Sequence, residues 1–271
     1  MRESQPLFAI DYLCLGKPAM MSTMARDEVA SLRYLQWEET FHDTKPYTLY
    51  MDVPDGFPPQ NFKVDAEEPE TIHDVRGHES EYSLDDNGFA YYKHHFELEN
   101  YDRETLERDY IPQVEAFLMK TIPNATEVKI YTWRLRSSDS AVRNKLPGGV
   151  VNLSNPSHHL APATAVHVDY PLAVADGSTL DPNDLIAADY VRTTYQGENL
   201  LPLYNKNCRW HYMSDQTPDD ILLFKSHDSR EQSKAKSMLD PADFVPSKAV
   251  LMYLSVLPRS QMCQSREKAS K

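Results

Sequence analysis

The chain has 271 residues, with 41 acidic and 28 basic side chains and a formal net charge of -13 at pH 7. Its length suits one large domain over residues 1–271, and its 41% hydrophobic and 25% charged residues are typical of folded rather than disordered proteins. Because a strongly negative charge repels polyphosphate backbones and anionic membrane surfaces, we expect neither nucleic acid nor a membrane as a partner.

Cysteine usage and the N-terminal residues bear on the compartment. The three cysteines, Cys14, Cys208 and Cys263, are widely spaced, odd in number and without a CxxC pair. They indicate neither a disulfide framework nor a thiolate zinc site, which fits a reducing compartment. The first residues lack the apolar core of a secretory signal, and no later run approaches the ~20 apolar residues that span a bilayer. We therefore expect a soluble, cytoplasmic protein.

The chain as a whole is predicted to favour strands and loops over long helices. Nineteen prolines and eight glycines punctuate the sequence, and short apolar runs bounded by Pro, Asn, Asp or Gly favour strands and loops. Residues 26–38 fit a helix or a strand, and periodicity does not decide between them. Residues 46–76 are predicted to be extended and loop-rich, ending in a strand and turn at 71–77.

The clearest helix is predicted over residues 102–121. Apolar residues recur there every three to four positions after an acidic start, and Pro112 is expected to kink the helix. Residues 127–135 then alternate between apolar and polar side chains, which predicts a strand inside a sheet. A long loop is expected at 137–162, and 258–271 is expected to be a disordered tail. Further strands are predicted near residues 163–170, 171–175, 208–213, 220–225 and 249–257.

The predicted strand at 163–170 carries the most informative stretch, His167-Val168-Asp169. Side chains two apart on a strand project to the same face, so His167 and Asp169 are expected to point together. An imidazole nitrogen and a carboxylate oxygen placed in this way fit two adjacent corners of an iron(II) octahedron, which a second histidine would complete as a facial triad. By itself the tripeptide is weak evidence, because a hydrogen-bonded or surface pair is the commoner case.

Other histidines of the chain are less favoured as metal ligands. His211 and His227 each lie near a predicted strand, but a satisfied structural or surface histidine is the favoured interpretation of both. The pairs at 94–95 and 158–159 are adjacent residues, which point to opposite faces of a strand and so do not chelate one ion in regular structure.

Two further groups are interpreted mainly as structural. Residues 74–77 are predicted to form a turn with a local ion pair, with a substrate-facing loop as the alternative. The aromatic residues Phe89, Tyr91, Tyr92 and Phe96 are predicted to lie in the core, with a pocket wall as the alternative. The sequence contains no GxGxxG, Walker or Gly-x-Ser-x-Gly motif, so nucleotide-binding and serine hydrolase functions are not supported.

Several sequence blocks occur together in one order between about residue 30 and residue 229. They are residues 32–35, 45–47, 72–77, 82–85, 88–89, 167–169, 171–176, 209–212, 217–225 and 228–229. In these blocks the chain resembles the fungal AsaB-like hydroxylase/desaturase family, which is related to gibberellin desaturase and 7-alpha-cephem-methoxylase proteins. Several blocks in order are far more specific than any one motif.

The resemblance implies a mainly β fold with some α and a jelly-roll (double-stranded β-helix) core. It also implies that His167 and Asp169 are metal ligands for Fe(II), with 2-oxoglutarate as cosubstrate and a small-molecule natural product of secondary metabolism as substrate. Family members have a further core strand before the block at 171–176, whereas here Tyr170 directly precedes Pro171. The jelly roll is therefore expected to be incomplete.

Two functional hypotheses follow from the resemblance. The first is a non-haem oxidoreductase that hydroxylates or desaturates its substrate. The second is a catalytically degenerate or truncated member that acts as a non-enzymatic binding protein, because the family's distal histidine follows the block at 228–229 and this chain has no histidine after His227. The third iron ligand, the substrate and the oligomeric state stay open.

Overall fold

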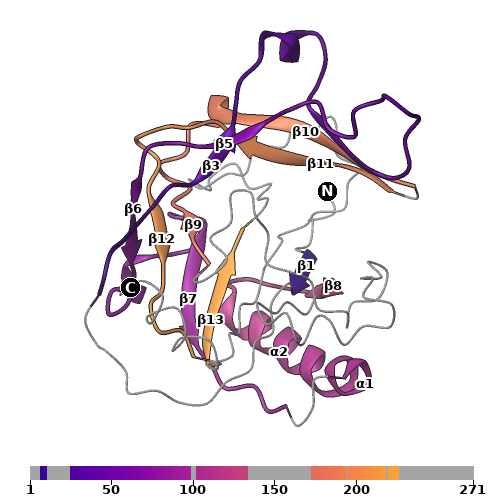
Figure 1. The fold of residues 1–271 in the computed structure, drawn as a ribbon. Coiled ribbons are helices and arrows are strands. Elements are labelled where there is room, and N and C mark those ends of the chain that lie inside the picture. The colour runs from indigo at the N-terminus through magenta and orange to yellow at the C-terminus, as the bar shows by residue number, and fades with distance from the viewer. Residues whose placement is uncertain are drawn as a thin grey trace, which may run out of the picture.

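The computed structural model describes residues 7–10, 25–98, 102–133, 172–193, 195–217 and 219–225. Within these residues the chain is mainly β-strand with one helical region, as expected, and no helix there is both long and apolar enough to cross a membrane (Figure 1). Several predicted features lie outside the described residues: His167, Asp169, His227, the pair at 158–159, the loop at 137–162, the strands at 163–170 and 249–257, and the tail at 258–271.

A four-stranded sheet brings together segments that are far apart in the sequence. Its strand order is β2 (Glu28–Ala30), β6 (Glu70–Asp74), β12 (Trp210–Tyr212) and β9 (Val174–Ala175). Strands β6 and β12 run parallel, and the outer two pair antiparallel. The predicted strand regions at 71–77, 171–175 and 208–213 are thus confirmed, and the region 26–38, for which the sequence left helix and strand open, contains two short strands, Glu28–Ala30 and Arg33–Leu35.

A two-stranded sheet packs against one face of this central sheet. It pairs β7 (Phe89–Lys93) with β13 (Asp220–Phe224) in antiparallel register. The predicted aromatic core is confirmed for Phe89, Tyr91 and Phe96, which are buried, while Tyr92 is half-buried. The apolar cluster between the two sheets consists of Val75, Phe89, Tyr91, Leu172, Val174, Met213 and Leu222.

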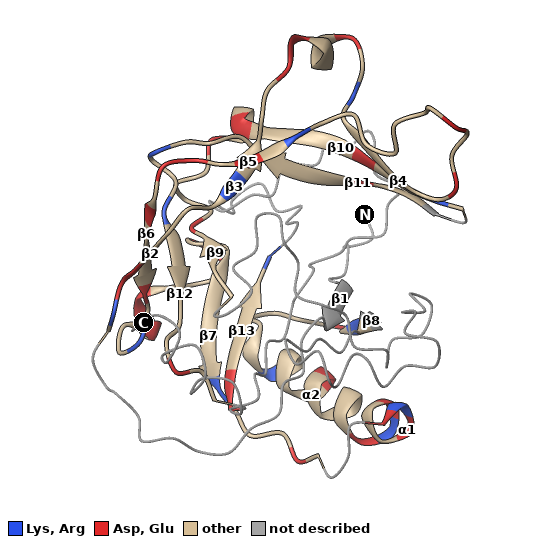
Figure 2. Ribbon diagram, viewed as in Figure 1, with Lys and Arg blue, Asp and Glu red and all other residues tan. Residues whose placement is uncertain are grey.

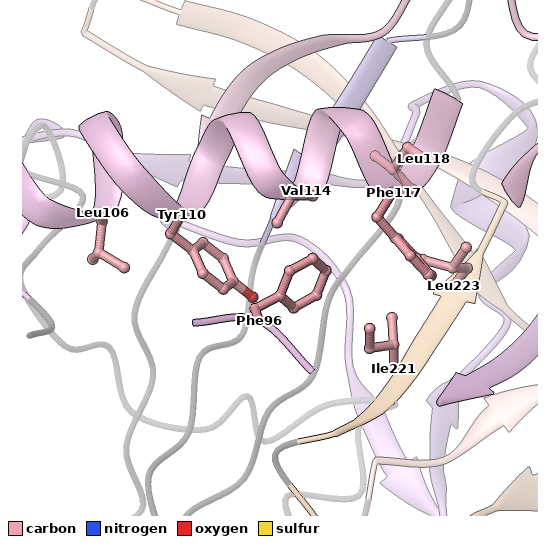
Figure 3. Packing of buried hydrophobic residues seen from close by; sticks show 8 residues of the cluster. All are labelled: Phe96, Leu106, Tyr110, Val114, Phe117, Leu118, Ile221 and Leu223. Atoms are coloured by element: carbon pink, nitrogen blue, oxygen red, sulfur yellow. The ribbon is translucent and has the colours of Figure 1, made fainter. Parts of the chain in front are cut away.

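The helical region covers the far face of β7 and β13 (Figure 3). It runs through α1 (Arg103–Thr105), a π-helical segment (Leu106–Tyr110) and α2 (Ile111–Thr121), and Asp102 caps its start by accepting the Thr105 N–H at 2.9 Å. The π-helical turns end next to Pro112, which has no N–H to donate to the preceding turn. The buried residues of this cluster are Phe96, Leu106, Tyr110, Val114, Phe117, Leu118, Ile221 and Leu223.

The remaining strands form three smaller sheets. A hairpin of β10 (Leu185–Arg192) and β11 (Tyr195–Pro202) pairs with β4 (Tyr47–Tyr50). The hairpin was not predicted from the sequence, because most of its residues are only half-buried and show no clear alternation. The other two sheets pair β3 (Arg33–Leu35) with β5 (Val64–Ala66) and β1 (Leu7–Ile10) with β8 (Lys129–Trp133). Short 3₁₀ helices span Glu39–His42, Glu79–Glu81 and Pro182–Asp184.

A buried network of charges holds the parallel pairing of β6 and β12 in register. The Asp74 carboxylate accepts the Arg76 N–H at 3.0 Å and the Ser214 N–H at 2.9 Å. The Arg76 guanidinium donates to the Ser214 carbonyl at 2.5 and 3.1 Å. Both side chains are about 5% exposed. The predicted structural turn at residues 74–77 is confirmed, but the Arg76 guanidinium forms its ion pairs with Glu79 and Asp220, outside the turn.

The same guanidinium reaches β13 through Asp220, whose carboxylate is buried. Arg76 Nη1 lies 3.3 Å from Asp220 Oδ1, and Lys93 Nζ lies 2.6 Å from the same oxygen. The basic end of β7 lies beside the acidic end of β13 (Figure 2). Burial favours the neutral acid, but the donors Lys93, Thr217 and Arg76 outweigh it and lower the pKa of Asp220.

Removing Arg76 should destabilise the fold strongly, because it would leave the Ser214 carbonyl and part of the Asp220 carboxylate buried without their donor. We expect Arg76→Met to lower the free energy of unfolding by roughly 3 kcal/mol. The exposed pair of Arg103 and Glu107, at 2.8 Å, supplies the control, and Arg103→Met should cost less than about 1 kcal/mol. Urea denaturation at pH 7 measures both; equal losses would show that the Arg76 network is not stabilising.

Candidate functional site

His211 lies at the centre of the four-stranded sheet and faces the apolar cluster between the two sheets. Its neighbours on β12, Trp210 and Tyr212, point to the opposite face, as the alternation of a strand requires. The His211 ring packs against Tyr82 at 4.9 Å and Phe89 at 5.5 Å between ring centroids. It is therefore enclosed by aromatic side chains, and the residue is 5% exposed.

Neither ring nitrogen of His211 has a hydrogen-bond partner, and both are shielded from solvent. The expectation of a satisfied structural histidine is therefore correct about burial and wrong about hydrogen bonding. Burial lowers the pKa of His211 from its ordinary value of 6.5 to about 4. The ring is consequently neutral near pH 7 and has one nitrogen lone pair that no donor satisfies.

His73 on β6 is the direct cross-strand partner of His211 in the parallel register. Their ring centroids are 5.6 Å apart, on the same face of the sheet. His73 is more open, with 42% of its side chain exposed, and its Nδ1 lies 3.0 Å from Asp27 Oδ2. This pair was not predicted from the sequence, because the two histidines are distant in sequence and only the strand register brings them together.

Asp27 is held in place by the backbone. Its Oδ1 accepts the Asp74 N–H at 3.0 Å, and this bond, together with the one from His73, lowers the pKa of Asp27 despite some opposition from burial. An ionised Asp27 favours the His73 tautomer that carries its proton on Nδ1. That tautomer leaves the Nε2 lone pair of His73 available.

A buried carboxylate follows β9 and closes the edge of the sheet beside β12. Asp176 is 2% exposed and accepts the Ser178 hydroxyl at 2.6 Å and the Ser178 N–H at 3.0 Å. Arg209 Nη2 contributes a further contact at 3.3 Å. Because its oxygens are occupied by these donors, Asp176 serves to fix the turn after β9.

His94 and His95 have separate neighbours. The His94 ring packs on Phe96 and Phe117, with centroids 4.6 and 4.8 Å away, while His95 Nδ1 lies 2.8 Å from Asp219 Oδ1. Neither arrangement joins the two rings in one site, in agreement with the expectation for adjacent residues.

A metal ion in this fold needs imidazole and carboxylate donors. Across residues 25–98, 102–133, 172–193, 195–217 and 219–225, no three His, Cys, Asp or Glu side chains gather closely enough to hold one. The predicted ligands His167 and Asp169 are an imidazole and a carboxylate, the chemical types that hold non-haem iron. The donor chemistry therefore fits iron.

Acidification should destabilise the protein through His211. Because the folded-state pKa is about 4 and the ordinary value is 6.5, the unfolded chain takes up this proton first as the pH falls. The contribution of neutral His211 to the free energy of unfolding is intact above pH 6.5. It is lost between pH 6.5 and 4, by up to about 3 kcal/mol. Urea denaturation in EDTA at several pH values should show this loss.

The variant His211→Phe keeps an aromatic ring in the same cage and removes the titrating group. As the pH falls from 6.5 to 4, the wild type should therefore lose more unfolding free energy than His211→Phe. The carboxylates Asp27 and Asp220, whose pKa values are lowered, lose their contribution only at more acidic pH. Parallel curves for the two proteins across this range would contradict the assignment.

The chain is similar in sequence to known fungal oxidoreductases. The chain is 28% identical over 193 residues to the hydroxylase/desaturase asaB of Aspergillus flavus, covering 65% of this chain and 70% of that protein. It is 23% identical over 198 residues to the Fe(II)/2-oxoglutarate-dependent dioxygenase nvfI of Aspergillus novofumigatus, covering 58% and 69%. The resemblance stated from the sequence blocks is thereby confirmed.

The solved structure of the iron and alpha-ketoglutarate-dependent endoperoxidase NvfI is similar in fold. It superposes with a TM-score of 0.53 and 16% sequence identity, covering 82% of this chain and 94% of that one. The expected mainly β, jelly-roll fold is confirmed. A family model described as "Oxidoreductase/YMDC permease-like domain" matches residues 32–170 and 169–249. Because this match spans well over half of the sequence, the chain belongs to that oxidoreductase family.

Proposed function

We propose that the protein is a non-haem iron(II)/2-oxoglutarate-dependent oxidoreductase that hydroxylates or desaturates a small natural product of secondary metabolism. Family membership and the names of its relatives support this function. The observation that carries it is the His167-Val168-Asp169 stretch inside the matched region, which supplies an imidazole and a carboxylate two residues apart. The net charge and the widely spaced cysteines support a cytoplasmic location.

In this proposal His167 and Asp169 hold the metal. Bound iron(II), with 2-oxoglutarate and dioxygen, supplies the power to abstract hydrogen from an unactivated carbon. The part of the chain next to the ligands in sequence is apolar: Leu172 and Val174 pack with Phe89 in the cluster between the sheets.

The second candidate is a non-enzymatic binding protein that retains the fold. The observation that favours it is the sequence after His227, which contains no histidine to act as the third iron ligand. The two candidates differ in one measurable property, since only the enzyme needs iron(II) and 2-oxoglutarate to bind together.

Anaerobic titration with iron(II) in the presence of 2-oxoglutarate tests the proposal. A weak metal-to-ligand charge-transfer band should appear, because 2-oxoglutarate chelates iron through two oxygens when two or three protein ligands hold the metal. His167→Ala and Asp169→Ala should each abolish the band and weaken iron binding.

His78→Ala is the matched control. His78 also contacts a carboxylate, Glu81 at 2.7 Å, but it is exposed and lies on a surface turn. This variant should leave the band unchanged. No band in the wild type, together with equal iron affinity in wild type and His167→Ala, would remove the oxygenase function and favour the binding protein.

A further inference from the structure

We propose that His73 and His211 form a binding site for a divalent transition-metal ion of the zinc type, built from residues other than His167 and Asp169. The two imidazoles are paired directly across parallel strands β6 and β12 and lie on one face of the sheet. This site does not depend on the proposed oxygenase function.

The separation of the rings suits a shared ion. Imidazole nitrogens bind zinc at about 2.0–2.1 Å, so two rings on one ion have centroids roughly 5 to 6 Å apart. The observed distance between the His73 and His211 centroids is 5.6 Å. Two parallel strands thus hold the rings side by side, at a centroid separation compatible with one shared ion.

The hydrogen bonding of His211 points to a missing partner. Both ring nitrogens are buried and unpaired, and leaving a buried polar group unsatisfied lowers stability. The face of Tyr82 or Phe89 can receive the ring N–H, but an aromatic face cannot supply a donor to the nitrogen that carries the lone pair. A metal ion would satisfy that lone pair.

The surroundings of His73 resemble the usual support of a metal-binding histidine. Its Nδ1 contacts Asp27 Oδ2 at 3.0 Å, which orients the ring and leaves Nε2 for an ion. Asp27 is in turn fixed by the Asp74 N–H at 3.0 Å. The His73 side chain is 42% exposed, so an ion can enter from its side, and water would complete the coordination.

Zinc titration of the full-length protein tests the site. The titration uses a background carrying His167→Ala and Asp169→Ala, so that the proposed iron ligands do not contribute. We expect one equivalent of Zn²⁺ to bind by calorimetry, and His73→Ala and His211→Phe should each weaken binding by roughly tenfold or more. Asp27→Asn should weaken it to a smaller extent, since Asp27 acts only by positioning His73.

His78→Ala in the same background is the control and should bind zinc as tightly as its parent. His73 is half exposed, so His73→Ala keeps the test decisive even if His211→Phe is destabilised. Absence of zinc binding in the background protein, or equal affinity in the His73→Ala and His78→Ala variants, would overturn the proposal. Neither result depends on whether iron(II) and 2-oxoglutarate bind to the wild type.

Discussion

The parallel pairing of β6 with β12 is the constraint on which the rest of the described structure depends. It joins segments far apart in sequence, and the buried Asp74 and Arg76 fix its register through the backbone of Ser214. Buried charges are tolerated only when they are paired and fully hydrogen-bonded. This network satisfies that condition and extends through Asp220 to the facing sheet, so one guanidinium links both layers.

The two faces of β12 have different chemical roles because of this register. On one face Trp210 donates to the Tyr34 hydroxyl at 2.8 Å, and that hydroxyl donates to Glu70 at 2.7 Å. The polar groups of these three side chains are therefore linked by hydrogen bonds. On the other face His211 is enclosed by aromatic rings with both nitrogens unpaired. A stable sheet thus carries an imidazole at a cost in stability, which is characteristic of positions retained for binding rather than for folding.

Family membership and fold do not by themselves fix the chemistry of this chain. Oxidoreductase folds of this kind provide two packed sheets, and the reaction depends on the ligands placed between them. The proposed iron ligands are two residues apart in the sequence, whereas the His73 and His211 pair comes from two strands that meet only in the folded protein. The chain therefore combines a motif visible in its sequence with a pair of donors created by its topology.

The sequence by itself predicted the features that depend on local patterns. The helix at 102–121 follows from its apolar spacing and the Asp102 cap, the strands at 208–213 and 220–225 from short apolar runs, and the turn at 74–77 from its residue types. The interpretation of the His-x-Asp stretch is equally local, because side chains two apart on a strand share a face, and it stays a prediction since residues 167–169 lie outside the described residues.

Tertiary structure decided what depends on contacts between distant segments. It determined that residues 26–38 form strands, since pairing with β6 and β5 outweighs an ambiguous local pattern. It also formed the hairpin at 185–202, whose half-buried residues give no clear period. Above all, it placed His73 beside His211 and left the His211 nitrogens unpaired. Strand register and burial are properties of the whole fold, and neither is encoded in the residues around a single histidine.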